Sequence, residues 1–386
     1  MITQLSFSTK PSFISLTHSI SIQQRSEPTV HYPILDGLRG FACLIVVFTH
    51  NFGFTNYFFF GWFSVDLFFV ISGFLITRSL LQTKEQSHYF RNFYFKRILR
   101  IFPLYYLTLI FFFWIVPHIN NFPIDMNYYV ANQWWFWTYL QNWFIIFKTP
   151  GNATNVIQHF WSLAVEEQFY LVWPWIILLI KKPKNILAFT AFLLLAVIAL
   201  RFLVWALQIK GLNYQGLYNF TRIDGICAGS MLAILWYNGS RFLEKNLTTL
   251  VFVLAGFNFL FFFFNQHYHF TFPYLAIVGY ATFAVLFALL VYESVKGRNK
   301  ILNLFFGNTI LRFVGKISFS YYILHWPVFK IFYSPVYDWL DNHSSFSDYS
   351  VKLITSSLLT IAGFFISICS YYGFERHFLK MKKVFN

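Results

Sequence analysis

The chain has 386 residues, of which 57% are hydrophobic and 24% aromatic, while only 11% are charged. Soluble domains carry roughly a quarter charged residues, so this composition excludes a soluble globular protein and a disordered chain. A net charge of +15 would indicate nucleic-acid binding in a soluble protein. In a membrane protein, such an excess of basic residues is typical of cytoplasmic loops that face anionic lipid. We therefore expect a single bundle of helices embedded in a lipid bilayer, with no nucleic-acid partner.

The N-terminal segment, residues 1–30, is polar and lacks the continuous apolar core of a signal peptide. We interpret it as a cytosolic tail or an overlong start. Cys43, Cys227 and Cys369 all lie inside apolar runs and have no metal-ligand spacing. We expect them to be packing residues, with no disulfide framework and no bound metal.

Ten segments are long and apolar enough to cross a membrane. They lie near residues 35–54, 58–81, 98–117, 157–180, 186–207, 219–237, 247–265, 272–293, 309–331 and 351–374. The sequence therefore predicts an all-α polytopic membrane protein, a bundle of about ten transmembrane helices. The aromatic stretch 134–147 is too short for a comfortable span, so we expect it to lie in the interface or to re-enter the membrane.

Lysine and arginine residues alternate between the predicted loops. Both termini and the loops 82–97, 181–185, 238–246 and 294–308 carry two or more of these residues. The loops that start at 51, 118, 208, 266 and 332 carry one or none. By the positive-inside rule, both termini are then cytoplasmic, and residues 378–386 form a basic cytosolic tail.

Several predicted spans contain ionisable side chains, each of which costs about 3 kcal/mol in a membrane and is therefore a candidate for function. The predicted orientation places seven of them in the outer half: His50, Asp66, Glu166, Glu167, Arg222, Asp224 and His325. Three lie at the inner edge: Arg39, Arg97 and Arg100. The outer group has the composition of an acid–base site, and the inner group suits phosphate oxygens.

Structural explanations compete with some of these assignments. Arg97 and Arg100 fit snorkelling residues at a cytoplasmic helix end, and His325 fits an interfacial histidine. Asp66 and Asp224 fit structural partners of an arginine or histidine side chain. A structural histidine in an apolar helix is uncommon, so His50 is the strongest candidate for a functional residue.

Seven motifs in order make the chain resemble the acyltransferase-3 family of integral membrane acyltransferases over residues 31–377. They are LDGLRG, Arg39 followed by His50 after ten residues, VDLFFVISGFLI, the RxxR pair Arg97 and Arg100, WSLAVEEQFY, RIDGICAG and SYYILHWPVF. Each motif alone is weak, whereas seven in this order on ten spans are specific.

The resemblance implies transfer of an acyl group, commonly acetyl from acetyl-CoA, to a carbohydrate hydroxyl. Acceptors in the family include O-antigen, exopolysaccharide, peptidoglycan and lipo-oligosaccharide, and succinyl-CoA is an alternative donor. The family match also favours a bacterial inner membrane. Many members append an extracellular hydrolase-like domain, but this sequence ends nine residues after His377, so we expect a stand-alone membrane acyltransferase.

The resemblance carries the Arg/His signature of the family over to Arg39 and His50, and the RxxR pair to Arg97 and Arg100. We expect the three arginines to meet the phosphates of the donor. We expect His50 to act as general base, with Glu167 or Asp66 orienting its imidazole. Adjacent helical residues point about 100° apart, so only one of the Glu166–Glu167 pair is expected to face the site. Transient acylation of His50 or another group is the alternative mechanism. The expected acceptor-binding residues are Asp224, Arg222, His325, Trp161 and Ser162.

Two other classes of function compete with an enzyme. A proton-coupled transporter or flippase of a glycan or lipid-linked sugar would also contain intramembrane His, Asp and Glu. The absence of an evident sequence repeat and the cationic inner edge count against it. A sensor or structural protein would not keep this many intramembrane charges. The sequence does not indicate an oligomeric state.

Overall fold

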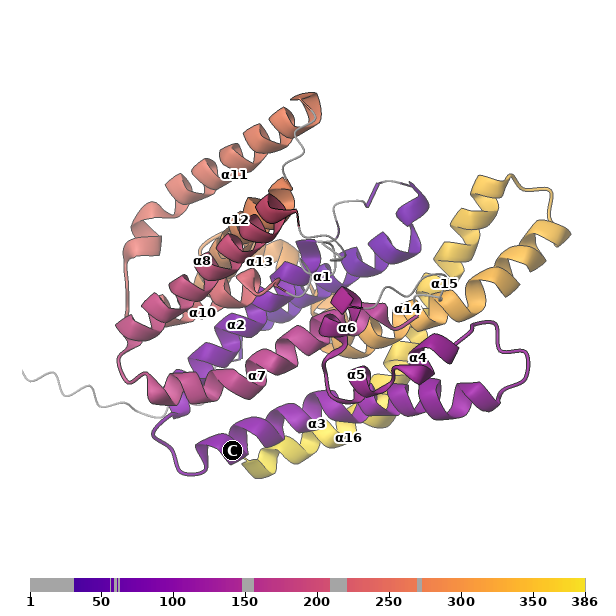
Figure 1. The fold of residues 1–386 in the computed structure, drawn as a ribbon, viewed down its shortest axis with the longest axis horizontal. Coiled ribbons are helices and arrows are strands. Elements are labelled where there is room, and N and C mark those ends of the chain that lie inside the picture. Colours follow the sequence, from indigo (N-terminus) through magenta and orange to yellow (C-terminus); the bar gives the residue numbers. More distant parts are fainter. Residues whose placement is uncertain are drawn as a thin grey trace, which may run out of the picture. The chain divides into compact units, whose positions relative to one another are not determined.

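A computed structural model describes residues 31–55, 57–58, 61, 63–147, 156–208, 221–268 and 273–385. The expected N-terminal tail, 1–30, lies outside the described residues. None of the described residues forms a strand, so the predicted all-α class is confirmed. Helix labels follow Figure 1.

The long helices are α1 (Pro33–Asn51), α2 (Ser64–Thr83), α3 (Tyr89–Ile110), α7 (Trp161–Leu179), α8 (Pro183–Leu207), α10 (Asp224–Tyr237), α11 (Phe242–Tyr268), α12 (Tyr280–Lys296), α14 (Thr309–His343) and α15 (Asp348–Ser370). The short ones are α4 (Asn127–Ala131), α5 (Trp134–Trp137), α6 (Gln141–Phe147), α13 (Lys300–Phe306) and α16 (Arg376–Met381). Short 3₁₀ or π turns are η1 (Gly53–Thr55), η3 (Phe111–Ile115), η4 (Val116–His118), η5 (Gln158–Phe160), η6 (Leu275–Gly279), η7 (Tyr371–Glu375) and η8 (Lys382–Phe385).

Each of the ten predicted spans coincides with one long helix. Seven helical segments of the described residues are long and apolar enough to cross a membrane, which makes the chain an integral membrane protein. The other three predicted spans lie on α7, α10 and α14. Helix α10 has only 14 residues, while polar and charged residues lower the mean hydropathy of α7 and α14. The count of ten spans and the cytoplasmic position of both termini remain predictions.

Helices α1 and α14 approach each other at backbone distance (Figure 1). A Cβ atom on Gly40 would lie 2.0 Å from the carbonyl oxygen of Leu311, and one on Gly315 would lie 1.8 Å from that of Asp36. Only glycine fits at such a crossing, as in other close pairs of membrane helices. The same device joins α2 to α10, where a Cβ on Gly229 would lie 2.0 Å from the Val70 carbonyl oxygen.

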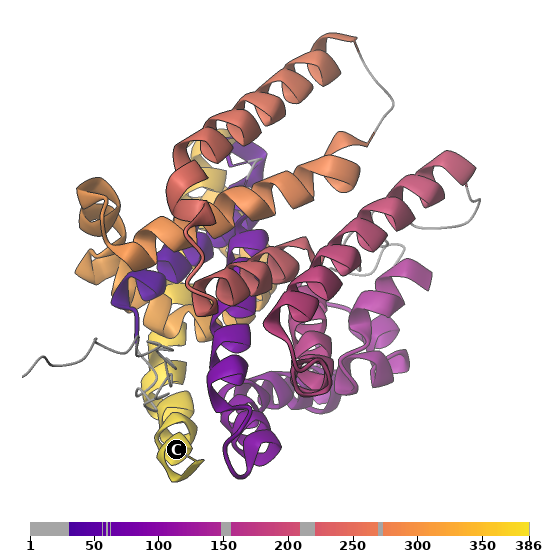
Figure 2. The same cartoon turned by 90° about the vertical axis from the view of Figure 1, so that its left-hand side faces the viewer.

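Helices α8 and α11 lie at one side of the bundle, separated from α3, α15 and α16 (Figure 2). Their outward side chains are large and apolar; Phe252 of α11 and Leu203 of α8 are 74% and 54% exposed. Exposed apolar surface of this extent fits contact with lipid tails.

The aromatic stretch 134–147 forms the short helices α5 and α6, which pack against α3 and α7. Neither is long enough to cross a membrane, as predicted. The Tyr105 hydroxyl of α3 donates a 2.8 Å hydrogen bond to the Phe136 carbonyl, and the Tyr105 and Tyr139 rings stack 4.3 Å apart. The stretch is therefore folded into the core beside α3.

The close crossing of α1 and α14 should not tolerate one added methyl group at Gly40. Gly40→Ala should push the two helices apart and cost about 1–3 kcal/mol, because the methyl group cannot avoid the Leu311 carbonyl. Gly256→Ala is the matched control, since nothing lies within 4 Å of its Cβ position in α11. Thermal unfolding in detergent measures both; equal melting temperatures would contradict the close crossing.

Candidate active site

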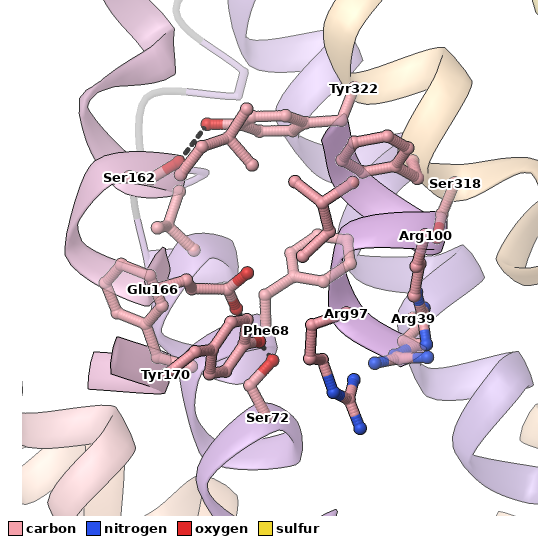
Figure 3. Close-up of a pocket in the computed structure, with 15 residues that line it drawn as sticks. Arg39, Phe68, Ser72, Arg97, Arg100, Ser162, Glu166, Tyr170, Ser318 and Tyr322 are labelled. Atoms are coloured by element: carbon pink, nitrogen blue, oxygen red, sulfur yellow. Dashed lines mark hydrogen bonds between the residues drawn. The ribbon is translucent and has the colours of Figure 1, made fainter. Parts of the chain in front are cut away.

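A pocket lies between α1, α2, α3, α7 and α14 (Figure 3). One end is lined by Arg39, Arg97 and Arg100, and the other by Ser162 and Tyr322. Ser72, Glu166, Tyr170, Phe68 and Ser318 contribute to its walls. The pocket therefore gathers the predicted donor residues of the first and third spans with one predicted acceptor residue, Ser162.

The three arginines of the pocket make no hydrogen bond or ion pair with any other described residue. Arg97 has its Nε atom buried without a hydrogen-bond partner, and its guanidinium lies 5.6 Å from the Tyr170 ring centre. The nearest acidic side chain in the pocket, Glu166, accepts a 2.7 Å hydrogen bond from the Ser72 hydroxyl. Three partly buried cations without an anion form a site that attracts a multiply charged anion such as a phosphate.

A fourth cation lies near the arginine cluster, at the C-terminal end of the described residues. It is Lys382, carried by the turn η8, which packs on α3. Burial and the nearby cations Arg100, Arg97 and Arg39 lower the pKa of Lys382 to about 6. Residues of the predicted basic cytosolic tail, 378–386, are helical as far as residue 385, and Lys382 adds to the cationic charge near the arginine cluster.

His50 and His325 form a direct pair, with 2.8 Å between Nδ1 of His50 and Nε2 of His325. The two rings are stacked with centres 5.1 Å apart. The close crossing of α1 and α14 produces this contact, because the two residues are 275 positions apart in the chain. The sequence placed both histidines in the outer half but did not predict that they touch.

Hydrogen bonding assigns the protons of the neutral pair. Nδ1 of His325 lies 2.9 Å and 2.8 Å from the carbonyl oxygens of Tyr321 and Tyr322, which can only accept, so this nitrogen carries a proton. Its Nε2 is then an acceptor and receives the proton of His50 Nδ1. The remaining nitrogen of His50, Nε2, keeps its lone pair and is in the correct state for a general base.

His159 and Tyr322 connect the histidine pair to the pocket. The His159 ring centre lies 5.3 Å from that of His325, and its Nε2 is 3.1 Å from the Tyr322 carbonyl oxygen. The Ser162 hydroxyl, 2.6 Å from the Tyr322 hydroxyl, closes the far end of the pocket. The arginine cluster and the histidines thus lie at opposite ends of one continuous set of contacts.

The expectation that Asp66 orients His50 is wrong. Both Asp66 oxygens bind Arg222, at 2.8 Å and 2.5 Å. Asp224 pairs with the fully buried Arg201. Both ion pairs lie close to the Tyr280 ring, whose centre is 4.3 Å from the Arg222 guanidinium and 5.5 Å from that of Arg201. Asp66, Asp224 and Arg222 therefore have structural partners, the alternative considered for the two aspartates.

No contact joins Glu167 to His50 either, so the expectation that Glu167 orients the His50 imidazole is also not met. Its Oε1 atom is buried without a hydrogen-bond partner, and it does not line the pocket. Glu166 is the member of the adjacent pair that faces the pocket. The Trp161 ring lies 5.9 Å from the Arg222 guanidinium, so it packs against the Asp66–Arg222 ion pair.

Three residues of the site were missed from the sequence. Arg201 is the single charged residue of an apolar run, and such a residue indicates that an acidic partner lies within the membrane. His159 lies at the very start of the predicted span 157–180, two residues before helix α7 begins at Trp161, so it resembles a residue of the preceding loop. Lys382 is hidden among the basic residues that the positive-inside rule already explains. Among the described residues, no three His, Cys, Asp or Glu side chains are arranged to hold a metal ion.

Comparison with known proteins places the chain in a family. A family model described as an acyltransferase domain, of acyltransferase-3 type, matches residues 32–375. The chain is 30% identical over 328 residues to a peptidoglycan O-acetyltransferase, OatA, of Listeria monocytogenes, covering 78% of this chain and 50% of that protein. It is 31% identical over 337 residues to a putative peptidoglycan O-acetyltransferase, YrhL, of Bacillus subtilis, covering 77% and 48%.

An O-acetyltransferase, OatA, of Staphylococcus aureus is 29% identical over 328 residues, covering 77% of this chain and 50% of that protein. The chain thus spans about half the length of these curated relatives. No solved structure gives a significant match. The family match covers nearly all described helices and includes the arginine cluster and the histidine pair, so the chain belongs to the acyltransferase-3 family.

Proposed function

We propose that the protein is a membrane O-acyltransferase that moves an acetyl group from acetyl-CoA to a hydroxyl of a carbohydrate on the other side of the membrane. The observation that carries the proposal is the pairing of an anion-binding arginine cluster with a histidine whose Nε2 is free to accept a proton. Both lie on α1, at Arg39 and His50, about 16 Å apart along the helix.

The arginine cluster suits the phosphates of coenzyme A, because guanidinium groups bind phosphate oxygens in pairs. The donor would enter from the cytoplasmic side, the position that the loop charges predict for this end of α1. Its extended pantetheine arm would follow the pocket toward Ser162 and Tyr322, which lie next to the histidines. Succinyl-CoA carries the same phosphates, so the pocket does not separate the two donors.

His50 would remove the proton of the acceptor hydroxyl as that oxygen attacks the thioester carbon. His325 then has the role that a carboxylate has in a serine–histidine–aspartate triad, since it holds the tautomer of the base. A neutral histidine stabilises an imidazolium less than a carboxylate does, but its Nδ1 proton is fixed by two backbone carbonyls. The thiolate of coenzyme A would leave and take the proton back.

The acceptor class rests on the relatives. Two of the relatives are named for peptidoglycan, which makes peptidoglycan the first glycan to test, ahead of O-antigen or exopolysaccharide. All of them are about twice as long as the matched region, so the acceptor of this chain is a proposal. A bacterial inner membrane is the location that this donor and this acceptor require.

The test of the function uses purified protein in proteoliposomes with acetyl-labelled acetyl-CoA and peptidoglycan fragments. Wild type should label the glycan, and His50→Ala should lower the rate by about 10²–10⁴-fold, because it removes the general base. His343→Ala is the matched control, an exposed histidine at the end of α14. Wild-type protein that transfers no label to any glycan, from acetyl-CoA or succinyl-CoA, would contradict the function.

We expect the protein to take up a proton at Lys382 when coenzyme A binds. Lys382 has a pKa of about 6, so it is mostly neutral at pH 7.5 in the free protein. Bound phosphates favour its charged form and raise that pKa, so coenzyme A binding should draw up to about one proton from the buffer. Above the raised pKa the proton is lost again, and the affinity contributed by Lys382 disappears.

Calorimetry of coenzyme A binding in buffers of different ionisation enthalpy measures this uptake. Lys382→Ala should take up fewer protons than wild type and bind more weakly, whereas Lys380→Ala, an exposed neighbour, should match wild type. Equal proton uptake by wild type and Lys382→Ala would place Lys382 outside the donor site.

A further inference from the structure

Lys330 is a cation close to His50 that has no part in the proposed binding of the donor or in the histidine pair. It lies on α14, one helical turn after Trp326, and its Nζ is 4.6 Å from the centre of the Trp326 ring. The same indole lies 4.8 Å from the ring centre of His50. The ammonium group and the candidate base therefore contact one shared aromatic side chain.

Lys330 has no anionic partner among the described residues. It is partly buried, and no hydrogen bond or ion pair to another described side chain or carbonyl involves it. Of the acidic residues farther along α14 and α15, Asp338 accepts from Ser334 and Asp348 pairs with Lys352. Asp341 is exposed and lies about 16 Å from Lys330 along α14. A partly buried ammonium without an anionic partner costs folding free energy, because it loses part of its hydration, and negative charge that forms nearby during function would compensate this loss.

We propose that Lys330 stabilises the negative charge that develops on the carbonyl oxygen when acyl transfer takes place at His50. This inference rests on the proposed function. In the step, Nε2 of His50 takes the hydroxyl proton, the hydroxyl oxygen bonds to the thioester carbon, and the carbonyl electron pair moves to the oxygen beside Lys330. The carbon–sulfur bond then breaks as the carbonyl reforms, and the thiolate takes the proton from the imidazolium.

Lys330 and His50 are close enough for this role. The distance from the Lys330 ammonium to the His50 ring cannot exceed the sum of the two distances to the Trp326 ring. A hydroxyl and a carbonyl aligned between a base and a cation occupy roughly 9 Å. The lysine side chain is flexible, and the Trp326 indole, stacked at 3° on Phe329, holds it by its aromatic face.

The other chemistry open to this cation is recognition of an anionic group on the acceptor. The two differ in which kinetic constant they change: loss of a transition-state contact lowers kcat, and loss of a ground-state contact raises KM. The His50 contact favours the first, because the charge of the reaction forms within reach of the base.

The experiment measures acetyl transfer to an uncharged oligosaccharide and to an anionic one by wild type, Lys330→Met and Lys330→Arg. Lys330→Met should lower kcat about 10²-fold for both acceptors with little change in either KM. Lys330→Arg keeps the charge and should recover part of the rate. Lys316→Met is the matched control: it also lies on aromatic rings of the bundle, 5.3 Å from Tyr372, but roughly 21 Å away along α14.

Coenzyme A binding by each variant shows that the donor site is intact. A wild-type rate in Lys330→Met, or a rise of KM confined to the anionic acceptor, would overturn the inference while leaving the proposed function in place. Absence of transfer by wild type itself would instead be the failure of the proposed function.

Discussion

The close crossing of α1 and α14 is the contact on which the candidate site depends. Glycine at positions 40 and 315 lets the two backbones meet, and this approach brings His50 within hydrogen-bonding distance of His325. Helix α1 also carries Arg39 into the pocket. One pair of helices therefore sets both the proton-accepting end of the site and part of its anion-binding end.

The buried charges separate into two groups with different physical roles. Asp66, Arg222, Asp224 and Arg201 neutralise one another around Tyr280, which is how charges persist in an apolar bundle. Arg39, Arg97 and Arg100 line the wall of a pocket and have no anionic partner among the described residues. This division weakens the case for a proton-relay transporter, because the paired carboxylates are occupied, and it favours an enzyme that binds an anionic donor.

Sequence reasoning located the helices, the arginine cluster and His50, because each has a local signal: apolar length, cationic spacing or a lone histidine in an apolar run. It did not find which charges pair. Asp66 and Arg222 are 156 residues apart, and the partner of a buried charge is decided by helix packing that one sequence does not reveal. The same limit explains why a carboxylate was expected at His50 where His325 is found, and why Lys330 was overlooked.

The proposed mechanism requires one pocket to receive the donor at the arginines and to present its acyl group to His50. A structure of the protein with bound coenzyme A would show whether it does. We expect the phosphates against Arg39, Arg97 and Arg100, with the thiol near Ser162 and Tyr322 on the side of His50. Coenzyme A bound elsewhere, or with its thiol directed away from the histidine pair, would contradict it.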